Sequence, residues 1–345
     1  MLLVRQAGPK DFAGVFSLAK LLDSYNLPAD RGYIRQLLQD SQASFARHLP
    51  RAKARYLFVL VKRGGEASPI VGCSLIIAKH GVPGRPHLWF SLETLPKYSR
   101  TLRLKRSNRV LRLGSTQDGP TEVGGLVVAP GYRKHSQRCG MQISFVRFLY
   151  MAIHPERFED RILVEYRGAM GEGNRSPFWE RVGKIFTGLS YKEADRLSIF
   201  NKEFILSLMP REPIYCALLP PLVQMAIGAI HPAAQRAARL LQSIGFRPLP
   251  QIEPFDGGPY YSARREEIRL VRQTRRLRVG APFALSLVEA RTGQRMLIGT
   301  DADGLFRAAW VRGSVVGKEV RMGGKEMEDL NTQVGDTVYV CPLSR

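Results

Sequence analysis

The order of short apolar runs and amphipathic helices constrains this chain more than any other feature of its sequence. LLVRQ predicts a first strand, Gly8-Pro9 a turn, and the segment from Asp11 a helix. YLFVLVKRGGEASPIVGCSLIIA holds two apolar runs around a turn with two glycines, which is typical of a hairpin. TEVGGLVVAP and RILVEYRG predict further strands, separated by a loop and an apolar helix. This alternation indicates an α/β (α+β) fold.

Two segments depart from this alternation and suggest how the chain is divided. Residues 169–228 contain aromatic clusters such as SPFWERVGKIF and predict a mainly helical insertion. Beyond about residue 275, FALSLVEA, RMLIGTDADGLFRAAWV and VGDTVYVCPL predict short strands with tight turns. We therefore expect a main domain over residues 1–272 and a small β-rich domain over 273–345.

Composition excludes several classes of protein. The chain is 44% hydrophobic and 24% charged, and it has no apolar stretch long enough to span a bilayer. The first residues lack the charged-then-apolar layout of a signal peptide, so a cytoplasmic protein is expected. The cysteines form no CxxC pair and have no metal-ligand spacing, which predicts reduced thiols and no metal site. They are Cys73, Cys139, Cys216 and Cys341.

The net charge of +22 favours an anionic partner or ligand. Residues 95–114 contain seven basic residues and no acid, and residues 262–280 contain seven arginines and two glutamates. Neither segment interleaves aromatic residues or matches a nucleic-acid recognition module. Nucleic-acid binding is one interpretation. The other is a solvated basic face that tolerates a phosphate-rich cofactor or a partner protein.

GAIHPAAQRAARLLQSIGF places a histidine directly before a proline at the start of a predicted helix. Pro232 suits the first helical position, where its missing N–H costs nothing, so His231 falls at or beside the N-cap. Apolar residues follow at helical spacing, and Gly245 closes the helix. The positive end of the helix dipole lowers the pKa of His231 and favours the neutral imidazole. His231 is therefore an acid/base candidate or a structural capping residue.

The layout also resembles the GNAT superfamily, whose acyl-CoA N-acyltransferase fold has a mixed, mostly antiparallel sheet. In such a fold, backbone N–H groups at a helix N-terminus bind the pyrophosphate of coenzyme A. The corresponding strand here is GGLVV and the loop is RKHSQRCGM. The superfamily expects Arg or Gln, two residues, Gly, one residue, and Gly or Ala. Gln137 and Gly140 match the first two positions, whereas Gln142 occupies the last.

A closer resemblance rests on several short motifs in one order. RGAMGEGNRSPFWERVGKIF, the AD of YKEADRL, KEFILSLMPREPIY, GAIHPAAQRAARLLQSIGF and EPFDGGP follow one another along the chain. They resemble the arginine N-succinyltransferase family, which carries RG, SPFW, LMP-PIY, a histidine at a helix start, GF and FDGGP. The likeness is strong from about residue 122 to 272 and thin before that.

This resemblance implies transfer of a succinyl group from succinyl-CoA to the α-amino group of L-arginine, in arginine breakdown. His231 then corresponds to the family's catalytic acid/base, which could take a proton from the attacking ammonium or give one to the departing thiolate. Leu126 matches the position whose backbone binds succinyl-CoA, with Val127 and Val128 beside it. Further along the loop, the residues expected at the phosphates are Arg133, Gln137 and Gly140.

Other residues keep two interpretations. Glu165 could hold the substrate amine or guanidinium or be an ordinary strand-end acid, and Arg167 could bind a carboxylate or pair with Glu165. Asp256 could shape the turn before the glycines of FDGGP or contact the substrate. Phe178 and Trp179 are expected in the core.

Three departures from the family leave the function open to alternatives. The phosphate loop is two residues longer, the tract before the central strand is basic, and the positive charge opposes a cationic substrate unless acids line the pocket. The alternatives are an acyltransferase acting on ornithine or another amine, or using acetyl-CoA, and a degenerate basic subunit that binds a partner or nucleic acid. Assembly as a homo- or hetero-oligomer is possible in each case.

Overall fold

A computed structural model describes residues 2–22, 26–63, 68–282, 293–302 and 304–343. The chain folds into two compact units. Unit 1 comprises Met1–Ala78, Val123–Asp160 and Arg264–Arg345, and unit 2 comprises Lys79–Glu122 and Arg161–Ala263. Each unit is therefore built from segments that are distant in the sequence.

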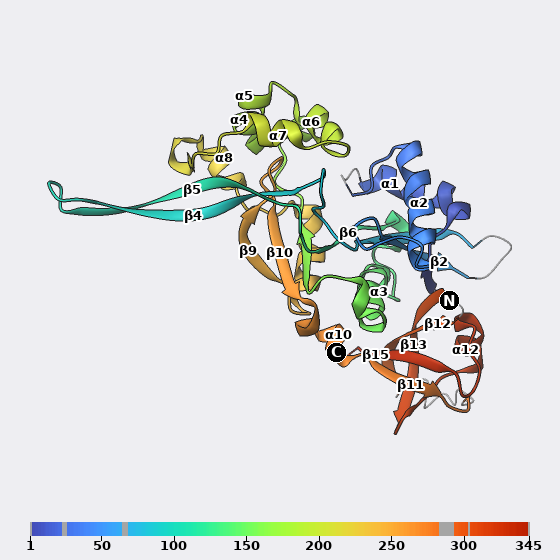
Figure 1. Ribbon diagram of the computed structural model, residues 1–345. Helices are drawn as coiled ribbons and strands as arrows, with labels where there is room; N and C mark the ends of the chain where they lie inside the picture. The colour runs from blue at the N-terminus through green and yellow to red at the C-terminus, as the bar shows by residue number, and fades with distance from the viewer. Residues whose placement is uncertain (1, 23–25, 64–67, 283–292, 303, 344–345) are drawn as a thin grey trace. The chain divides into compact units, whose positions relative to one another are not determined.

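Unit 1 contains a sheet with helices packed against it (Figure 1). Its strand order is β12-β15-β11-β14-β13-β1-β2-β3-β6, and β11 and β14 are parallel. The strands are β1 (Leu2–Gln6), β2 (Arg55–Lys62), β3 (Ile70–Ile77), β6 (Thr121–Val128), β11 (Arg275–Val279), β12 (Gln294–Ala302), β13 (Leu305–Val316), β14 (Glu319–Arg321) and β15 (Thr337–Pro342). The helices are α1 (Phe12–Leu22), α2 (Arg31–Phe45), α3 (Cys139–Ile153), α10 (Arg269–Gln273) and α12 (Gly324–Leu330).

The core of unit 1 explains why its apolar runs are so clear in the sequence. Strands β2 and β3 are buried over nearly their whole length, which is why both are continuous apolar runs. Helix α3 is buried around most of its circumference, so most of its residues are apolar, with Gln142 and Arg147 as buried exceptions. Asp30 caps α2 by accepting a hydrogen bond from the N–H of Tyr33, at 2.8 Å.

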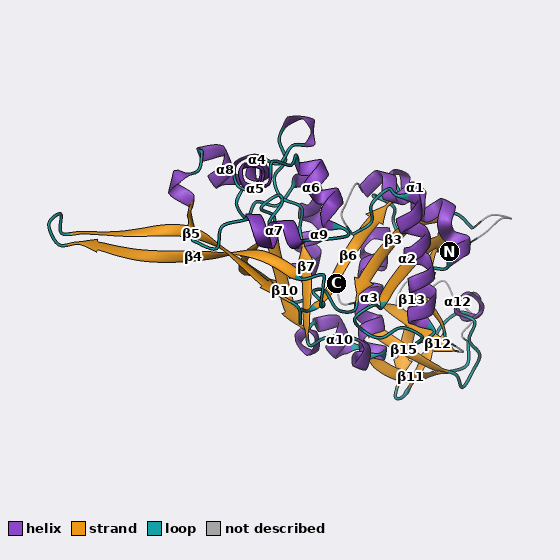
Figure 2. Cartoon of the chain, turned by 45° about the horizontal axis from the view of Figure 1, so that its top comes forward, coloured by secondary structure: helices purple, strands orange, loops and turns teal. Residues whose placement is uncertain are grey.

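Unit 2 contains the remaining strands, in the order β7-β10-β9-β4-β5-β8, and a set of short helices (Figure 2). The first two residues of β6, Thr121 and Glu122, also belong to unit 2 and pair with β7. The strands are β4 (His87–Ser99), β5 (Leu104–Thr116), β7 (Arg161–Glu165), β8 (Ile214–Tyr215), β9 (Arg247–Ile252) and β10 (Pro259–Arg264). The helices are α4 (Pro177–Arg181), α5 (Gly183–Thr187), α6 (Tyr191–Ser198), α7 (Glu203–Leu208), α8 (Pro221–Ala226) and α9 (Gln235–Gln242). Phe178 and Trp179 are fully buried in its core, as expected.

The predicted mixed α/β class is confirmed, with three differences in detail. The basic segment near residues 95–114, for which the sequence predicted no structure, belongs to the long β4–β5 hairpin. The strand region expected near 249–262 is two antiparallel strands, β9 and β10. The helix expected from Pro232 to Gly245 is a 3₁₀ turn, Pro232–Ala234, followed by α9.

The small C-terminal domain expected over residues 273–345 stays a prediction. FALSLVEA lies outside the described residues, whereas β12, β13 and β15 contain the other two predicted segments. Because β13 pairs with β1, these strands belong to the same compact unit as the N-terminus.

Candidate active site

His231 lies at the N-cap of the turn that leads into α9, in unit 2. Its backbone N–H donates to the carbonyl oxygen of Arg167 at 2.8 Å, and its Nδ1 accepts from the N–H of Ala233 at 3.2 Å. The side chain is half-buried. Burial and the nearby Arg167 guanidinium lower the pKa of His231, while Asp256 opposes them. The imidazole is therefore neutral near pH 7.

The cap also fixes where the ring proton of His231 resides. A hydrogen bond from the N–H of Ala233 requires a lone pair on Nδ1. A neutral ring in this geometry carries its proton on Nε2, so that nitrogen is a donor. The proline that follows His231 in the sequence thus starts a turn that selects one tautomer.

A group of carboxyl side chains surrounds the end of β7 in the same unit. Strands β6 and β7 are parallel, with Glu122 opposite Leu163. Glu165 follows two residues later on β7, so Glu122 and Glu165 lie on the same face. Burial raises the pKa of Glu165 well above its ordinary value, and the neighbouring carboxyl groups of Glu122 and Asp256 raise it further.

Two more carboxyl groups come from the EPFDGG segment between β9 and β10. Glu253 is buried, and its Oε2 accepts the N–H groups of Phe255 and Asp256, at 2.7 and 2.8 Å. Burial, Glu165 and Asp256 raise the pKa of Glu253 well above its ordinary value. Four carboxyl groups of this unit thus lie near one another, and we call them the acidic cluster: Glu122, Glu165, Glu253 and Asp256.

Asp256 shapes the turn in which it lies. Its Oδ1 accepts the N–H of Gly258 and its Oδ2 accepts the N–H of Gly168, both at 2.8 Å. A Cβ at Gly258 would stand 2.0 Å from the carbonyl oxygen of Tyr166, so only glycine fits there. This is the geometry that the FDGGP motif predicts for Asp256.

Glu122 also pairs with a buried histidine that was not predicted from the sequence. Nδ1 of His80 lies 2.6 Å from Oε2 of Glu122, and both side chains are almost fully buried. The ring of His87 lies 4.7 Å from that of His80, centroid to centroid. Burial lowers the pKa of His87 well below its ordinary value, and His80 adds to the effect.

The loop predicted to hold phosphates lies in unit 1, before α3. Leu126, Val127 and Val128 end β6, and the side chain of Arg133 donates from Nε to the carbonyl oxygen of Val128 at 3.1 Å. Arg133 and Gln137 are exposed, as are the neighbouring Lys134 and Arg138. Gly140 lies in the first turn of α3, and that turn contains no acidic residue.

This part of the chain fits a pyrophosphate group. Helix α3 has 15 residues, so its N-terminus carries the partial positive charge of a full helix. The basic side chains in the loop add to that charge, and no carboxylate in the first turn opposes it. A Cβ at Gly140 would meet only Cγ2 of Val128, at 4.0 Å, so this glycine is not required by close packing.

Comparisons with known proteins identify the family. The family model described as "Arginine N-succinyltransferase beta subunit" matches residues 2–270. "Arginine N-succinyltransferase" of Yersinia pestis is 30% identical over 348 residues, which covers 99% of this chain and 98% of that protein. This chain belongs to the arginine N-succinyltransferase family. The prediction from the motifs is therefore confirmed.

Further relatives of this succinyltransferase chain come from Pseudomonas aeruginosa. "Arginine N-succinyltransferase subunit alpha" is 36% identical over 280 residues, or 80% of this chain and 81% of the relative. The solved structure of "arginine/ornithine succinyltransferase subunit AI" has a TM-score of 0.85 at 32% identity and covers 100% of this chain. The alignment spans 99% of that solved chain. The family is one of acyltransferases, so the chain is assigned to that enzyme class.

The structure places the predicted site residues of this succinyltransferase chain in two groups. Glu165, Arg167 and His231 all belong to unit 2. The guanidinium of Arg167 donates to Oδ1 of Asn174, a partner that neither sequence interpretation named. Unit 1 holds the residues predicted to bind succinyl-CoA, which are Leu126, Val127, Val128, Arg133, Gln137 and Gly140.

Three members of the buried network, Glu122, Glu253 and His80, were not predicted from the sequence. Two of them stand inside motifs that predicted other features, TEVGGLVV and EPFDGGP. For Glu122, the usable signal was a carboxyl group within a largely apolar strand, because a buried carboxyl group is rare without a partner.

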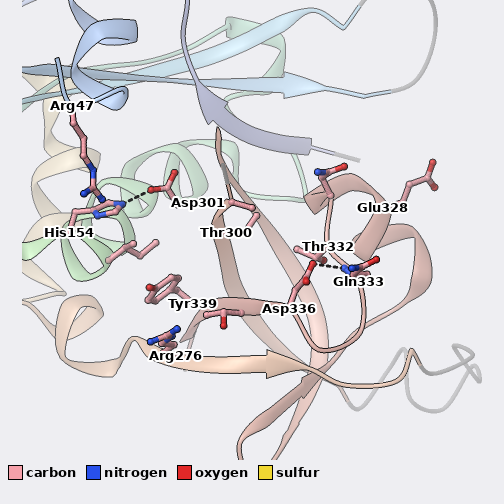
Figure 3. Close-up of a pocket in the computed structure, with 14 residues that line it drawn as sticks. Arg47, His154, Arg276, Thr300, Asp301, Glu328, Thr332, Gln333, Asp336 and Tyr339 are labelled. Carbon is pink, nitrogen blue, oxygen red and sulfur yellow. Dashed lines mark hydrogen bonds and ion pairs between the residues drawn. The ribbon is translucent and has the colours of Figure 1, made fainter. Parts of the chain in front are cut away.

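Unit 1 also contains an open polar pocket of about 790 Å³ (Figure 3). Arg47 and His154 lie on one side of it, and Nε2 of His154 is 2.6 Å from Oδ2 of Asp301. None of the residues predicted for catalysis or for binding succinyl-CoA lines this pocket. This pocket therefore does not include the predicted site.

Among the described residues, no group of three or more His, Cys, Asp or Glu side chains is arranged to hold a metal ion. Nor does this part of the chain contain a helix with the length and apolar character needed to cross a membrane. All four cysteines are buried and unpaired.

Proposed function

We propose that this chain transfers the succinyl group of succinyl-CoA to the α-amino group of L-arginine. The observation that carries the proposal is the acidic cluster around Glu165, in the same unit as the neutral His231. A chain with a net charge of +22 needs local carboxylates to attract a cationic substrate. The family assignment supplies the reaction class.

In this proposal the carboxylate of Glu165 binds a cationic group of arginine. Glu165 is half-buried at the end of β7 and has two carboxyl neighbours, Glu122 and Asp256. Like charges in a buried site are costly, and a bound guanidinium or ammonium ion relieves that cost. Arg167 is a candidate to bind the α-carboxylate of the substrate or the free carboxylate of the succinyl group.

His231 acts on the leaving group. The α-amine attacks the thioester carbonyl, an amide N–C bond forms and the C–S bond breaks. The amine loses a proton and the departing sulfur gains one. Since Nδ1 of His231 accepts the N–H of Ala233, Nε2–H is the ring group left to donate a hydrogen bond. In this proposal it stabilises the departing thiolate as a donor, while the proton that the sulfur gains is the one that the amine loses.

The loop before α3 holds the donor's phosphates in this proposal. Leu126 and its neighbours in GGLVV offer backbone groups to the pantetheine arm, as in a GNAT-like acyl-CoA N-acyltransferase fold. Arg133, Gln137 and Gly140 lie near the N-terminus of α3, where an anion is stabilised by N–H groups and the helix dipole.

A second acceptor, ornithine, is favoured by one specific observation. A solved relative with 32% identity over the whole chain carries the name "arginine/ornithine succinyltransferase". Ornithine bears an ammonium group where arginine bears guanidinium, and a carboxylate cluster binds either.

A thiol-release assay tests the proposal. Succinyl-CoA and acetyl-CoA are each offered with arginine, ornithine, lysine and glutamate, and free coenzyme A is measured over time. We expect release with succinyl-CoA and arginine, weaker release with ornithine, and none with glutamate. Release with acetyl-CoA but not with succinyl-CoA would mean that the acyl donor is acetyl-CoA. No release with any pair of donor and amino acid would favour a degenerate subunit.

A further inference from the structure

Arg147 is an arginine buried inside unit 1. It lies in the middle of α3 and is only 1% exposed. An arginine is almost never buried this completely unless its guanidinium group is bound to other groups, because removing a charge from water is costly. The contacts of this guanidinium group therefore indicate what the buried charge contributes to the protein.

The guanidinium group of Arg147 is bound both to α3 itself and to β6. Within the helix, its Nε donates to the carbonyl oxygen of Ser144 at 3.0 Å, and its Nη2 donates to Oγ of Ser144 at 2.8 Å. Its Nη1 donates to the carbonyl oxygen of Gly124, on β6, at 3.4 Å. Because a guanidinium group is planar and its donors have fixed directions, the two bonds to Ser144 direct Nη1 toward β6.

The part of β6 that Arg147 contacts departs from regular strand geometry. Gly125 has a φ of +55°, in the left-handed region that favours glycine, and its carbonyl oxygen accepts from Sγ of Cys73 at 3.7 Å. Two successive carbonyl oxygens of β6 thus receive side-chain donors. A Cβ at Gly124 would stand 2.6 Å from Nδ2 of Asn26, so this backbone is also closely packed. A left-handed glycine within a strand changes the direction of the peptide groups that follow it.

The peptide groups that follow are those of Leu126, Val127 and Val128. We propose that Arg147 is a positioning residue for the acyl donor: by holding the carbonyl group of Gly124, it fixes the direction of the backbone groups that bind the pantetheine arm. This role rests on the proposed function, because the same stretch of β6 is assigned there to the donor. Arg147 itself is too deeply buried to contact the donor, so it acts through the backbone of β6.

The position of Arg147 along α3 separates this role from phosphate binding. The phosphate loop precedes Cys139, the first residue of α3, and Arg147 lies about 12 Å further along the helix axis at 1.5 Å per residue. The field of a helix terminus falls off within its first turn. Loss of Arg147 should therefore weaken the binding of the pantetheine arm and leave the binding of the phosphates unchanged.

Calorimetry with two ligands tests this separation. Coenzyme A carries the phosphates and the pantetheine arm, whereas phosphoadenosine diphosphate, its nucleotide half, carries the phosphates alone. Arg147→Met keeps a long side chain without donors. We expect it to raise the dissociation constant for coenzyme A about tenfold or more, as for the loss of a charge-assisted hydrogen bond, and to leave that for the nucleotide half unchanged. In steady-state assays, the KM for succinyl-CoA should rise and the KM for arginine should not.

Two milder variants give graded effects. Arg147→Lys keeps a charged donor but not the planar group, so its affinity for coenzyme A should lie between those of the wild type and Arg147→Met. Ser144→Ala removes the hydroxyl group that orients the guanidinium, so it should weaken coenzyme A binding in the same direction by a smaller factor. If Arg147→Met does not fold, Ser144→Ala carries the same comparison of the two ligands.

Tyr150→Phe is the matched control on the same helix. It removes a buried hydroxyl group that accepts from Arg157, and its ring packs against rings of α2, β2 and β13. We expect a lower melting temperature and two unchanged dissociation constants.

The possible results separate failure of this role from failure of the proposed function. A wild type that binds no coenzyme A would overturn both. If the wild type binds coenzyme A, an Arg147→Met variant that melts earlier but binds it normally has lost only stability, and the positioning role is wrong. Equal weakening of coenzyme A and its nucleotide half would also overturn the role, because Arg147 would then support the donor site as a whole.

Discussion

The acidic cluster of unit 2 and the basic loop of unit 1 differ in how far their charged side chains are buried. Three of the four carboxyl groups of the cluster are fully buried, and burial together with the neighbouring carboxyl groups raises the pKa of Glu165. The loop leaves Arg133 and Lys134 exposed, where water screens them. A buried charge is costly, so a ligand of opposite charge that neutralises it binds strongly. An exposed charge contributes little to ligand binding. We therefore expect mutations to have unequal effects in the two regions.

The largest effect is expected at His231, beside the cluster. His231→Ala should lower kcat by about 10²–10⁴-fold, as expected for loss of an acid/base group, with little change in either KM. His231→Asn keeps an oxygen that can accept the N–H of Ala233, so it separates capping from catalysis. We expect it to fold normally and to be as inactive as the alanine variant. Steady-state thiol release gives the rates; His48→Ala is an exposed control.

Glu165→Gln should have the next largest effect. A charge-assisted hydrogen bond contributes about 1.5–3 kcal/mol, so the KM for arginine should rise about 10–100-fold. The KM for succinyl-CoA should not change, and Glu172→Gln, at an exposed position in the same unit, should change neither. Equal increases in both KM values would mean that Glu165 supports the fold rather than the substrate.

The basic loop should be more tolerant. Arg133→Ala combined with Lys134→Ala should raise the KM for succinyl-CoA about two- to thirtyfold, because exposed charges contribute about 0.2–1 kcal/mol each. The increase should be larger at low ionic strength, and the KM for arginine should stay the same. Lys10→Ala serves as an exposed basic control. If the loop variant changed the KM for arginine alone, the assignment of the loop to the donor would fail.

The smallest effect concerns stability and its dependence on pH. Because the folded pKa of Glu165 is raised, its favourable contribution is full below the unfolded pKa and is lost as pH rises through the folded pKa. Glu165→Gln should therefore melt about 2–4 °C above wild type at pH 8, for a gain of roughly 1 kcal/mol. The difference should shrink toward pH 4. A variant that is less stable at pH 8 would contradict the like-charge argument.

The features that the sequence predicted well are those built from neighbouring residues. Pro232 follows His231 directly, so the cap could be predicted from two adjacent residues, and Asp256 precedes the glycine whose N–H it accepts. The family itself was recognisable because its motifs are short and continuous. The β4–β5 hairpin was missed because its basic residues leave it without the continuous apolar runs that β2 and β3 have.

The sequence by itself determined the mixed α/β class, the neutral capping histidine and the basic loop before α3, since each depends on residues within one turn or one strand. Only the tertiary structure decided that Glu122, Glu165 and Glu253 share one buried region, because parallel pairing of β6 with β7 and the turn after β9 bring distant segments together. It also decided that residues 94–109 form an unsupported ribbon, since that depends on where the bordering strands stop. A cap or a turn depends on residues that are neighbours in the sequence, so it can be predicted from the sequence. The burial of a carboxyl group depends on packing between segments that lie far apart in the sequence, so only the tertiary structure shows it.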